Sequence, residues 1–224
     1  MTPYYSADGI TIYNADCREI VPGLDAKSLV VTDIPYNIKF HYQGYKDNLK
    51  DDVFKELLKI AVRAPSVVLC YPEIMFDVYD AVKRKPEECV AWVYNTNTPR
   101  QHRQISWFGT KPDFSKIKQP YKNPNDKRIK ALMKNGSQGT NIYDWWEVQQ
   151  VKNVSAEKTE FPCQIPLEIM KRIIMITDAD IIVDPFMGSG TTLLAAKELG
   201  KKAIGIELVE RHCQIAVERI KKGL

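Results

Sequence analysis

Short apolar segments alternate with segments of helical periodicity in the N-terminal part of the chain. Residues 28–32 and 66–71 are apolar and rich in β-branched side chains, which predicts two buried strands. Between them, apolar side chains over 54–62 recur at i, i+3, i+4, i+7 and i+8, as on one face of a helix. Pro72 marks the start of a second helix, and residues 89–94 form the next expected strand. This alternation favours parallel βαβ units.

The same alternation returns towards the end of the sequence. A helical face over 167–174 precedes an apolar strand over 181–183, and a helix that begins at Thr191 ends at Gly200. A strand over 202–206 and one more helix follow. We therefore predict an α/β protein with a Rossmann-like, mostly parallel sheet and helices on both faces.

The middle of the chain follows neither pattern. Over residues 95–160 the periodicity fades, and Pro, Asn, Gly, Lys and aromatic residues dominate, which is typical of loops. The length of 224 residues suits one large domain. We expect a single domain over residues 1–224, in which residues 95–160 are an insertion outside the core.

Composition narrows the class of protein. The chain is 44% hydrophobic and 27% charged, as globular proteins are. Its five cysteines form no CxxC pair and have no close histidine partners, so neither a disulfide framework nor a metal site is expected. No apolar run approaches the roughly 18 residues of a membrane span, and the first residues lack the features of a signal peptide. We predict a cytoplasmic protein that binds no metal and no membrane.

Positive charge is concentrated in one part of the middle segment. Residues 111–135 contain eight Lys or Arg against two Asp, a net charge of +6 in a chain whose total is +4. A positive segment on a nearly neutral body indicates a polyanionic partner, although a solvated lysine-rich loop has the same composition.

An apolar strand, a glycine-rich turn and a helix start follow one another near the end of the chain. Asp184 ends the strand and could accept a donor from a ligand, while Gly188 and Gly190 let the backbone approach it closely. Glu207, at the tip of the next strand, is placed to accept ribose hydroxyls. A P-loop would need a lysine after Gly190, and a dinucleotide fingerprint would need a third glycine that the turn lacks. The carboxylates suit the cationic groups of S-adenosylmethionine.

A second candidate turn follows the strand over 28–32. The carboxylate of Asp33 and a backbone carbonyl of the Pro35 turn could hold both hydrogens of an exocyclic amine on a nucleobase, which directs its lone pair towards a methyl donor. Tyr36 could stack on a base swung out of its helix. Taken alone, the tetrapeptide also fits an ordinary turn.

Taken together, these segments resemble a known family. Residues 33–36, 184–192 and 205–208, in this order, are similar to motifs of the amino-DNA methyltransferases of the permuted β class. Residues 14–17 and 161–166 resemble two further motifs of that class. The resemblance implies an enzyme that transfers a methyl group from S-adenosylmethionine to an amine of DNA, on a methyltransferase fold with circularly permuted motifs.

The resemblance also implies roles for single residues. The catalytic turn is Asp33, Pro35 and Tyr36. Ile34 replaces the first proline of this turn, and Phe161 and Ile165 replace basic residues that the class usually has. The implied cofactor-binding residues are Asp16, Cys17, Asp33, Gln164, Asp184, Phe186, Gly188, Ser189, Gly190, Thr191, Thr192 and Glu207.

The target implied by Asp33 is mainly the N6 amine of adenine, since cytosine-N4 enzymes more often have serine there. Cytosine N4 stays open, because both amines adjoin a ring nitrogen and the same acceptors serve either. The alternatives are an RNA or protein amine methyltransferase on the same fold, a binding module that Ile34 has inactivated, and an NAD-dependent oxidoreductase.

Residues 95–160 stand where the class keeps its target-recognition region. The partner is then double-stranded DNA, bound by a monomer or a homodimer. A loop over 38–46, with Gly44 as its hinge, is expected to close over the DNA beside the flipped base. The expected DNA-binding residues are Arg100, Arg103, Lys111, Lys116, Lys118, Lys122, Lys127 and Arg128.

Overall fold

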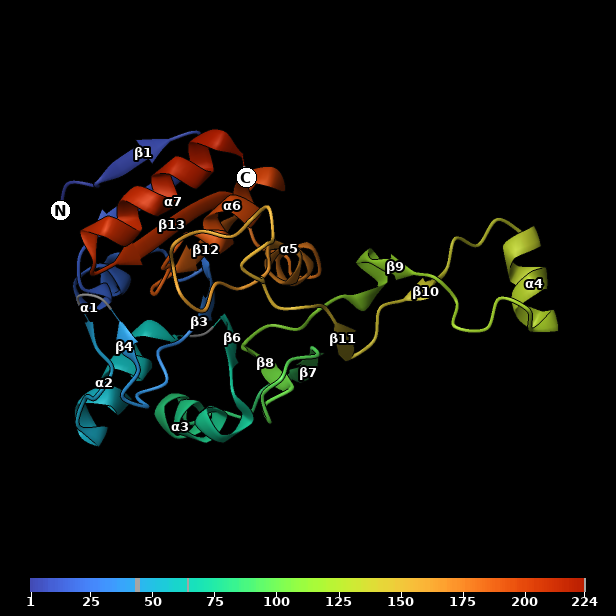
Figure 1. Ribbon diagram of the computed structural model, residues 1–224, viewed down its shortest axis with the longest axis horizontal. Coiled ribbons are helices and arrows are strands. Elements are labelled where there is room, and N and C mark those ends of the chain that lie inside the picture. Colours follow the sequence, from blue (N-terminus) through green and yellow to red (C-terminus); the bar gives the residue numbers. More distant parts are fainter. Residues whose placement is uncertain (43–44, 64, 224) are drawn as a thin grey trace.

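The computed structural model describes residues 1–42, 45–63 and 65–223. In this part of the chain, a body built around a nine-stranded sheet carries an arm that extends to one side (Figure 1). The strands of the sheet, in spatial order, are β1 (Tyr5–Ala7), β2 (Ile10–Asn14), β13 (Lys202–Glu207), β12 (Ile181–Asp184), β3 (Leu29–Asp33), β6 (Ser66–Cys70), β8 (His102–Phe108), β7 (Glu88–Val93) and β11 (Trp145–Glu147).

Most of the sheet is parallel. The strands from β2 to β6 in this order run parallel to their neighbours, as does the pair β7 and β11. Strand β1 is antiparallel to β2, and β8 is antiparallel to both β6 and β7. The predicted mostly parallel α/β sheet is confirmed.

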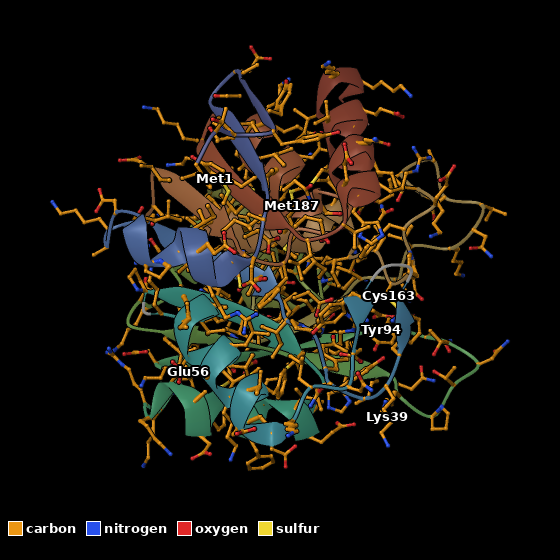
Figure 2. The ribbon with its side chains drawn as sticks, turned by 90° about the vertical axis from the view of Figure 1, so that its left-hand side faces the viewer. Met1, Lys39, Glu56, Tyr94, Cys163 and Met187 are labelled. Atoms are coloured by element: carbon orange, nitrogen blue, oxygen red, sulfur yellow. The ribbon has the colours of Figure 1, made fainter. Side chains whose placement is uncertain are left out.

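Helices cover both faces of the sheet, which Figure 2 shows from the end opposite to the arm. One face packs against α1 (Cys17–Ile20), α2 (Asp51–Ala61) and α3 (Pro72–Val82), with a short 3-10 turn η1 (Val21–Gly23). The other packs against α5 (Leu167–Met175), α6 (Thr191–Glu198) and α7 (Glu210–Lys222). Within the described ranges, no helix is long and apolar enough to cross a membrane.

Helix α2 illustrates how the pattern of the sequence becomes packing. Its side chains Phe54, Leu57, Leu58 and Ala61 are buried against the sheet, while the residues between them are mostly exposed. Burial of one large apolar side chain stabilises the fold by about 1.5–3 kcal/mol. This stripe therefore holds the helix in place, and it lies where the spacing of the apolar residues predicts it.

The order of the strands places two distant parts of the chain side by side. Strands β13 and β12, from the end of the chain, lie between β2 and β3, from its beginning. The C-terminal ends of β3 and β12 thus adjoin, and Thr32 Oγ1 donates a hydrogen bond of 2.7 Å to Asp184 Oδ1 across them. In open α/β sheets, such strand ends are where ligands bind.

The prediction that residues 95–160 are an insertion outside the core is wrong in one respect. Strand β8 lies within that range, and it is an inner strand of the sheet whose Ile105 and Trp107 are fully buried. Trp146 of β11 is also buried in the core. A strand with polar Arg103 and Ser106 facing the interior does not show simple alternation, so periodicity missed it.

The arm is formed by residues 109–144, between β8 and β11. Its base holds the 3-10 turn η2 (Phe114–Lys116) and a two-stranded ladder of β9 (Lys118–Gln119) and β10 (Thr140–Asn141). Its tip is the helix α4 (Lys127–Lys134), which has no buried residue. Asp126 caps this helix by accepting from the backbone N–H groups of Arg128 and Ile129.

Candidate active site

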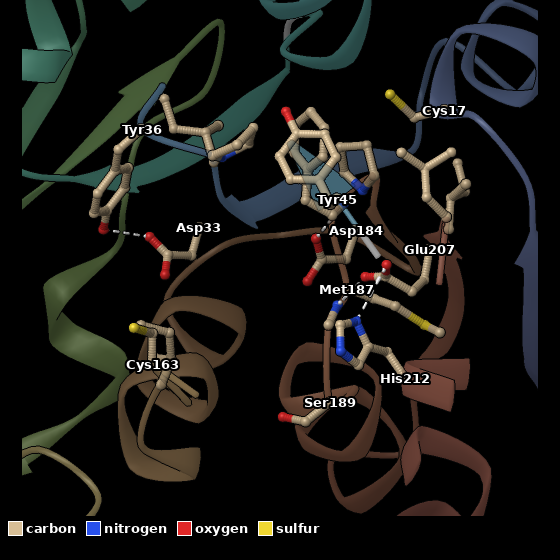
Figure 3. Close-up of a pocket in the computed structure, with 18 of the residues that line it drawn as sticks. Cys17, Asp33, Tyr36, Tyr45, Cys163, Asp184, Met187, Ser189, Glu207 and His212 are labelled. Atoms are coloured by element: carbon tan, nitrogen blue, oxygen red, sulfur yellow. Dashed lines mark hydrogen bonds and ion pairs between the residues drawn. The ribbon is translucent and has the colours of Figure 1, made fainter. Parts of the chain in front are cut away.

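A cavity of about 280 Å³ opens at the C-terminal ends of β3, β12 and β13 (Figure 3). The turn after β3, the glycine turn after β12, the end of β13 and the loop before α5 all contribute to its wall. Of the predicted catalytic and cofactor-binding residues, those that line it are Asp16, Cys17, Asp33, Pro35, Tyr36, Gln164, Asp184, Phe186, Gly188, Ser189, Thr191, Thr192 and Glu207.

Two glycines shape the turn between β12 and α6. Gly188 and Gly190 have φ values of 49° and 76°, in the left-handed region that favours glycine. A Cβ on Gly190 would lie 2.7 Å from Cβ of Ala216 in α7, and one on Gly188 would lie 2.6 Å from the ring of Phe161. Gly190 therefore lets α7 pack behind the turn, and Gly188 lets Phe161 pack on its front.

Asp184 holds the glycine turn together. Its buried carboxylate accepts hydrogen bonds from Oγ1 of Thr32 at 2.7 Å, Oγ1 of Thr192 at 2.5 Å and the backbone N–H of Phe186 at 3.1 Å. Burial raises the pKa of Asp184 to about 6, against the opposing effect of the two hydroxyls. Both oxygens are engaged by protein donors, so Asp184 fixes the shape of the turn while it lines the cavity. The expected contact of Asp184 with the cofactor stays a prediction.

A buried cation lies behind the same turn. Nη1 of Arg219, in α7, donates to the carbonyl and the hydroxyl of Ser189 at 2.9 and 3.1 Å, and to Oγ1 of Thr191 at 2.9 Å. Burial lowers the pKa of this guanidinium. Nothing in the local sequence singles out Arg219, since basic side chains in the last turn of a helix are common.

Glu207, at the end of β13, faces the cavity with its carboxylate fixed on two sides. Oε2 accepts from the backbone N–H of Gly188 at 3.1 Å, and Oε1 accepts from that of Val209 at 2.9 Å. Nδ1 of His212 lies 3.4 Å from Oε1 (Figure 3), and its own ring is only 8% exposed. The structure places His212 in the wall of this cavity.

Asp16 and Cys17 contribute from the start of α1. Asp16 caps this helix, and its carboxylate forms an ion pair of 2.5 Å with Arg18. The hydrogen bonds from Arg18 lower the pKa of Asp16. Burial raises the pKa of the Cys17 thiol to about 12, so it is an uncharged part of the wall at neutral pH.

Asp33 is the carboxylate at the end of β3. Its Oδ1 accepts a hydrogen bond of 2.7 Å from the hydroxyl of Tyr36 (Figure 3), and its Oδ2 forms an ion pair of 3.0 Å with Nη1 of Arg103. Burial raises the pKa of Asp33, and the charge of Arg103 opposes that rise. Tyr36 also packs against Tyr71, with ring centroids 4.9 Å apart.

Two of the three arginines predicted to contact DNA lie beside this turn. Arg103 comes from β8 and is 5% exposed, so it is a buried partner of Asp33 and does not lie where a phosphate would reach it. Arg100 is exposed, pairs with Glu73 at 2.6 Å and lies 4.5 Å from the ring centre of Tyr71. Periodicity could not find the pairing of Arg103, which depends on β8 lying next to β6 in the sheet.

Gln164 binds the loop before it. Its Oε1 accepts from the backbone N–H of Thr159 at 3.0 Å, and its Nε2 donates to the carbonyl of Glu157 at 2.7 Å. Although Gln164 lines the cavity, its amide therefore holds residues 157–159 in place. The expected direct contact of Gln164 with the cofactor stays a prediction.

The family of the chain follows from its sequence. A family model described as DNA methylase matches residues 64–218, well over half of the chain. The chain belongs to this family of DNA methylases. The expected resemblance to the amino-DNA methyltransferases of the β class is thereby confirmed.

Individual relatives agree with the family. The Type II methyltransferase M.ScaI of Streptomyces caespitosus is 27% identical over 98% of this chain and 84% of its own length. The DNA adenine methyltransferase YhdJ of Escherichia coli is 24% identical over 94% of this chain and 82% of its own length. The cytosine-N4-specific PvuII DNA methyltransferase shares the fold, with a TM-score of 0.65 and 18% identity over 99% of this chain and 96% of its own.

The cofactor of this methylase is S-adenosylmethionine, as expected, and similar solved structures include complexes with it. The residues of the cavity fit that group. Asp16, Asp33 and Glu207 line it with acidic groups that suit an ammonium and a sulfonium, and Nδ1 of the buried His212 has no hydrogen-bond partner among the described residues. The described residues contain no cluster of His, Cys, Asp and Glu that could hold a metal ion.

Ile34, which replaces a proline of the catalytic turn, is buried on the methylase's α2 side of the sheet. Its backbone N–H donates to the carbonyl of Leu69 at 3.4 Å. A proline could not make this bond. This hydrogen bond to β6 restrains the turn at the position where a proline ring would otherwise do so.

A second loop of the methylase covers the catalytic turn. Ile38, Phe40 and Tyr45 line the cavity, and the buried Asp47 accepts from the backbone N–H groups of residues 37, 38 and 40. The short pair β4 (His41–Tyr42) and β5 (Tyr45–Lys46) lies beyond them. Gly44, the expected hinge, lies outside the described residues.

The remaining predicted DNA-binding residues lie apart from the cavity, on the arm. Lys122 lies 5.6 and 5.5 Å from the ring centres of Tyr143 and Trp145 at the base of the arm. Lys116 forms an ion pair with Asp178 of the body. The exposed members of the set are Lys111, Lys116, Lys118, Lys122, Lys127 and Arg128.

Proposed function

We propose that this methylase transfers a methyl group to the N6 amine of adenine in double-stranded DNA. The observation that carries the proposal is the position of Asp33: a half-buried carboxylate at the end of β3, in the same cavity as the glycine turn after β12. An acceptor for an amine and a site for a methyl donor adjoin there. The relative named a DNA adenine methyltransferase supports adenine as the target.

The chain contributes positioning and proton acceptance. S-adenosylmethionine, when bound, supplies a methyl group activated by a sulfonium. Asp16, Glu207 and the glycine turn after β12 hold it at one end of the cavity. Asp33 and a backbone carbonyl of the Pro35 turn accept the two hydrogens of the amine, so that its lone pair points at the donor. Such alignment of two reactants can contribute roughly 7 to 11 kcal/mol.

Methyl transfer to the amine is a direct displacement. A bond forms between the amine nitrogen and the methyl carbon as the bond between that carbon and sulfur breaks, and the electron pair of that bond stays on sulfur. The nitrogen then carries an extra proton, which Oδ1 of Asp33 is placed to accept and pass to water. No covalent bond to the protein forms.

Access of the amine to the cavity requires the target base to leave the duplex. The ring of Tyr36 lines the cavity beside Asp33 and is placed to stack on the extruded base. We further propose that the exposed lysines of the arm contact DNA phosphates, and that the chain acts as one methyltransferase domain with the arm as its target-recognition element.

Cytosine N4 is the second candidate target, because the structural neighbour PvuII methyltransferase is specific for it and its fold covers 99% of this chain. Both targets offer an amine next to a ring nitrogen. An RNA amine is a further outcome to be tested.

The test is methyl transfer from labelled S-adenosylmethionine to genomic DNA lacking modified bases, and to RNA, with the labelled base then identified by chromatography. We expect labelled N6-methyladenine from DNA, and none with Asp33→Ala. A direct titration of that variant with S-adenosylmethionine separates loss of the amine acceptor from loss of cofactor binding. Label on cytosine N4 would move the proposal to the second target. Label only on RNA, or equal activity of Asp33→Ala, would refute it.

A further inference from the structure

Arg103 occupies a position that the methyl-transfer reaction as described above does not explain. It reaches Asp33 from β8, the antiparallel strand next to β6, and its side chain is 6% exposed. Its guanidinium carbon lies 5.6, 5.2 and 5.4 Å from the ring centres of Tyr36, Tyr71 and Trp92. An arginine enclosed by three aromatic rings and paired with a carboxylate has little freedom to move.

The two oxygens of Asp33 have different partners. Oδ2 faces the guanidinium of Arg103 at 3.0 Å, and Oδ1 faces the neutral hydroxyl of Tyr36 at 2.7 Å. A target amine that takes up the position of either donor must displace it. The hydroxyl of Tyr36 is the easier of the two to displace, because it is neutral, whereas Arg103 adds the attraction between two full charges in a largely buried site.

We propose that Arg103 is the positioning residue of Asp33: it keeps Oδ2 and thereby leaves Oδ1 as the acceptor for the target amine. The hydroxyl of Tyr36 holds the place of that amine on Oδ1 until the base enters. This inference rests on the proposed transfer to an exocyclic amine and holds for adenine or cytosine alike.

The surroundings of Asp33 explain why it needs such a partner. Tyr36, Cys70, Cys163 and Asp184 also face it from the catalytic turn, β6, the loop before α5 and β12. None of these four is a cation at neutral pH. Arg103 is therefore a positive charge that helps to keep this half-buried carboxylate ionised, and an ionised carboxylate accepts an amine hydrogen better than a protonated one.

The test compares single-turnover methyl transfer in the full chain between pH 5 and pH 9 for the parent, Arg103→Met and Arg103→Lys. For Arg103→Met we expect a rate lower by about a hundredfold at pH 7. We also expect the acidic limb of the profile to move upward by about one to three pH units, so that part of the rate returns at pH 9. Arg103→Lys keeps the charge and should restore the limb to the position of the parent, at a reduced rate because the fork geometry is lost.

Cofactor affinity, measured separately by calorimetry, should be the same in all three proteins. An acidic limb of Arg103→Met that coincides with that of the parent would overturn the inference. Arg103→Gln replaces the methionine variant if that variant does not fold. Failure of both to fold would also overturn the inference, because Arg103 would then serve the core. A parent that methylates no nucleic acid would instead refute the proposed function.

Discussion

The glycine turn after β12 and the arm between β8 and β11 both carry charged residues, but in opposite surroundings. In the turn, Asp184 and Arg219 are buried, and each makes several hydrogen bonds to the backbone and hydroxyls around it. In the arm, Lys118, Lys122 and Lys127 are exposed to solvent. The turn is a site whose shape is fixed before any ligand arrives, whereas the arm presents charge.

The two regions therefore differ in how they tolerate substitution. Polar groups in the turn depend on one another, so the loss of one leaves a buried partner unsatisfied, at a cost of about 1–3 kcal/mol. If the arm contacts DNA as proposed, its charges act independently on the polyanion, so their removal should change DNA affinity in steps.

The largest effect is expected from a methyl group added to the turn. Gly190→Ala combines a positive φ of 76° with a contact of 2.7 Å to Ala216, so we expect unfolding to become easier by about 4 kcal/mol and cofactor binding to be lost. Gly136→Ala in the arm is the matched control: its φ is 88°, and nothing lies within 4 Å of the added carbon. It should cost only about 1 kcal/mol. Urea unfolding of both variants measures the difference, and equal losses would contradict the contrast.

The second effect concerns the arm. Replacement of Lys118, Lys122, Lys127 and Arg128 by Ala should weaken DNA binding about a thousandfold at 0.1 M salt and reduce the slope of log K against log salt by about 3 to 4. Stability and cofactor affinity should not change, because all four side chains are exposed. Fluorescence anisotropy with a labelled duplex measures both quantities. An unchanged salt slope would show that the arm does not touch phosphates.

The same contrast explains what the sequence could predict. Asp33, the glycine turn and Glu207 were predictable because each follows an apolar strand and stands in a motif of local sequence. The role of Arg103 was not, because its partner Asp33 is 70 residues away in sequence, on another strand of the sheet. His212 is close to Glu207 in sequence, but the local pattern alone does not show that its ring turns towards Glu207.

A local sequence pattern also does not show which groups a motif residue contacts. Asp184 and Gln164 were predicted to bind the cofactor, and the structure shows their polar atoms engaged by Thr32 and Thr192, and by residues 157–159. Sequence motifs record that a residue belongs to a site, but its hydrogen-bond partners decide whether it faces the ligand or supports the wall. Only the folded arrangement supplies those partners.

The third effect is a pH dependence of stability from Asp184. Its pKa is about 6 in the folded protein against 3.8 for the free group, so between these values the folded state binds more protons than the unfolded state. Asp184 therefore contributes about 3 kcal/mol to the free energy of unfolding below pH 4. This contribution is lost as the pH rises through 6. Asp184→Asn removes the titration, so thermal unfolding of that variant should lose this part of the dependence between pH 4 and 7. If the unfolding temperatures of the parent and of Asp184→Asn change with pH in the same way, Asp184 is not the titrating group.

The smallest effect is expected where a residue of the cavity has two roles that can be separated. Tyr36→Phe keeps the ring that stacks on the extruded base and removes the hydroxyl that donates to Oδ1 of Asp33. Because the target amine no longer has to displace that hydroxyl, KM for DNA should fall by about tenfold, near the lower end of the roughly 1.5–3 kcal/mol of a hydrogen bond to a charged group. For Tyr36→Phe, the rate at saturating DNA should stay within about a factor of two. Tyr36→Ala removes the ring as well and should raise KM, since stacking on one base contributes about 1–3 kcal/mol. Steady-state kinetics on one duplex measures all three proteins. A higher KM for Tyr36→Phe would mean that the hydroxyl assists the base, and the place-holding role of Tyr36 would then be abandoned while the stacking role stands.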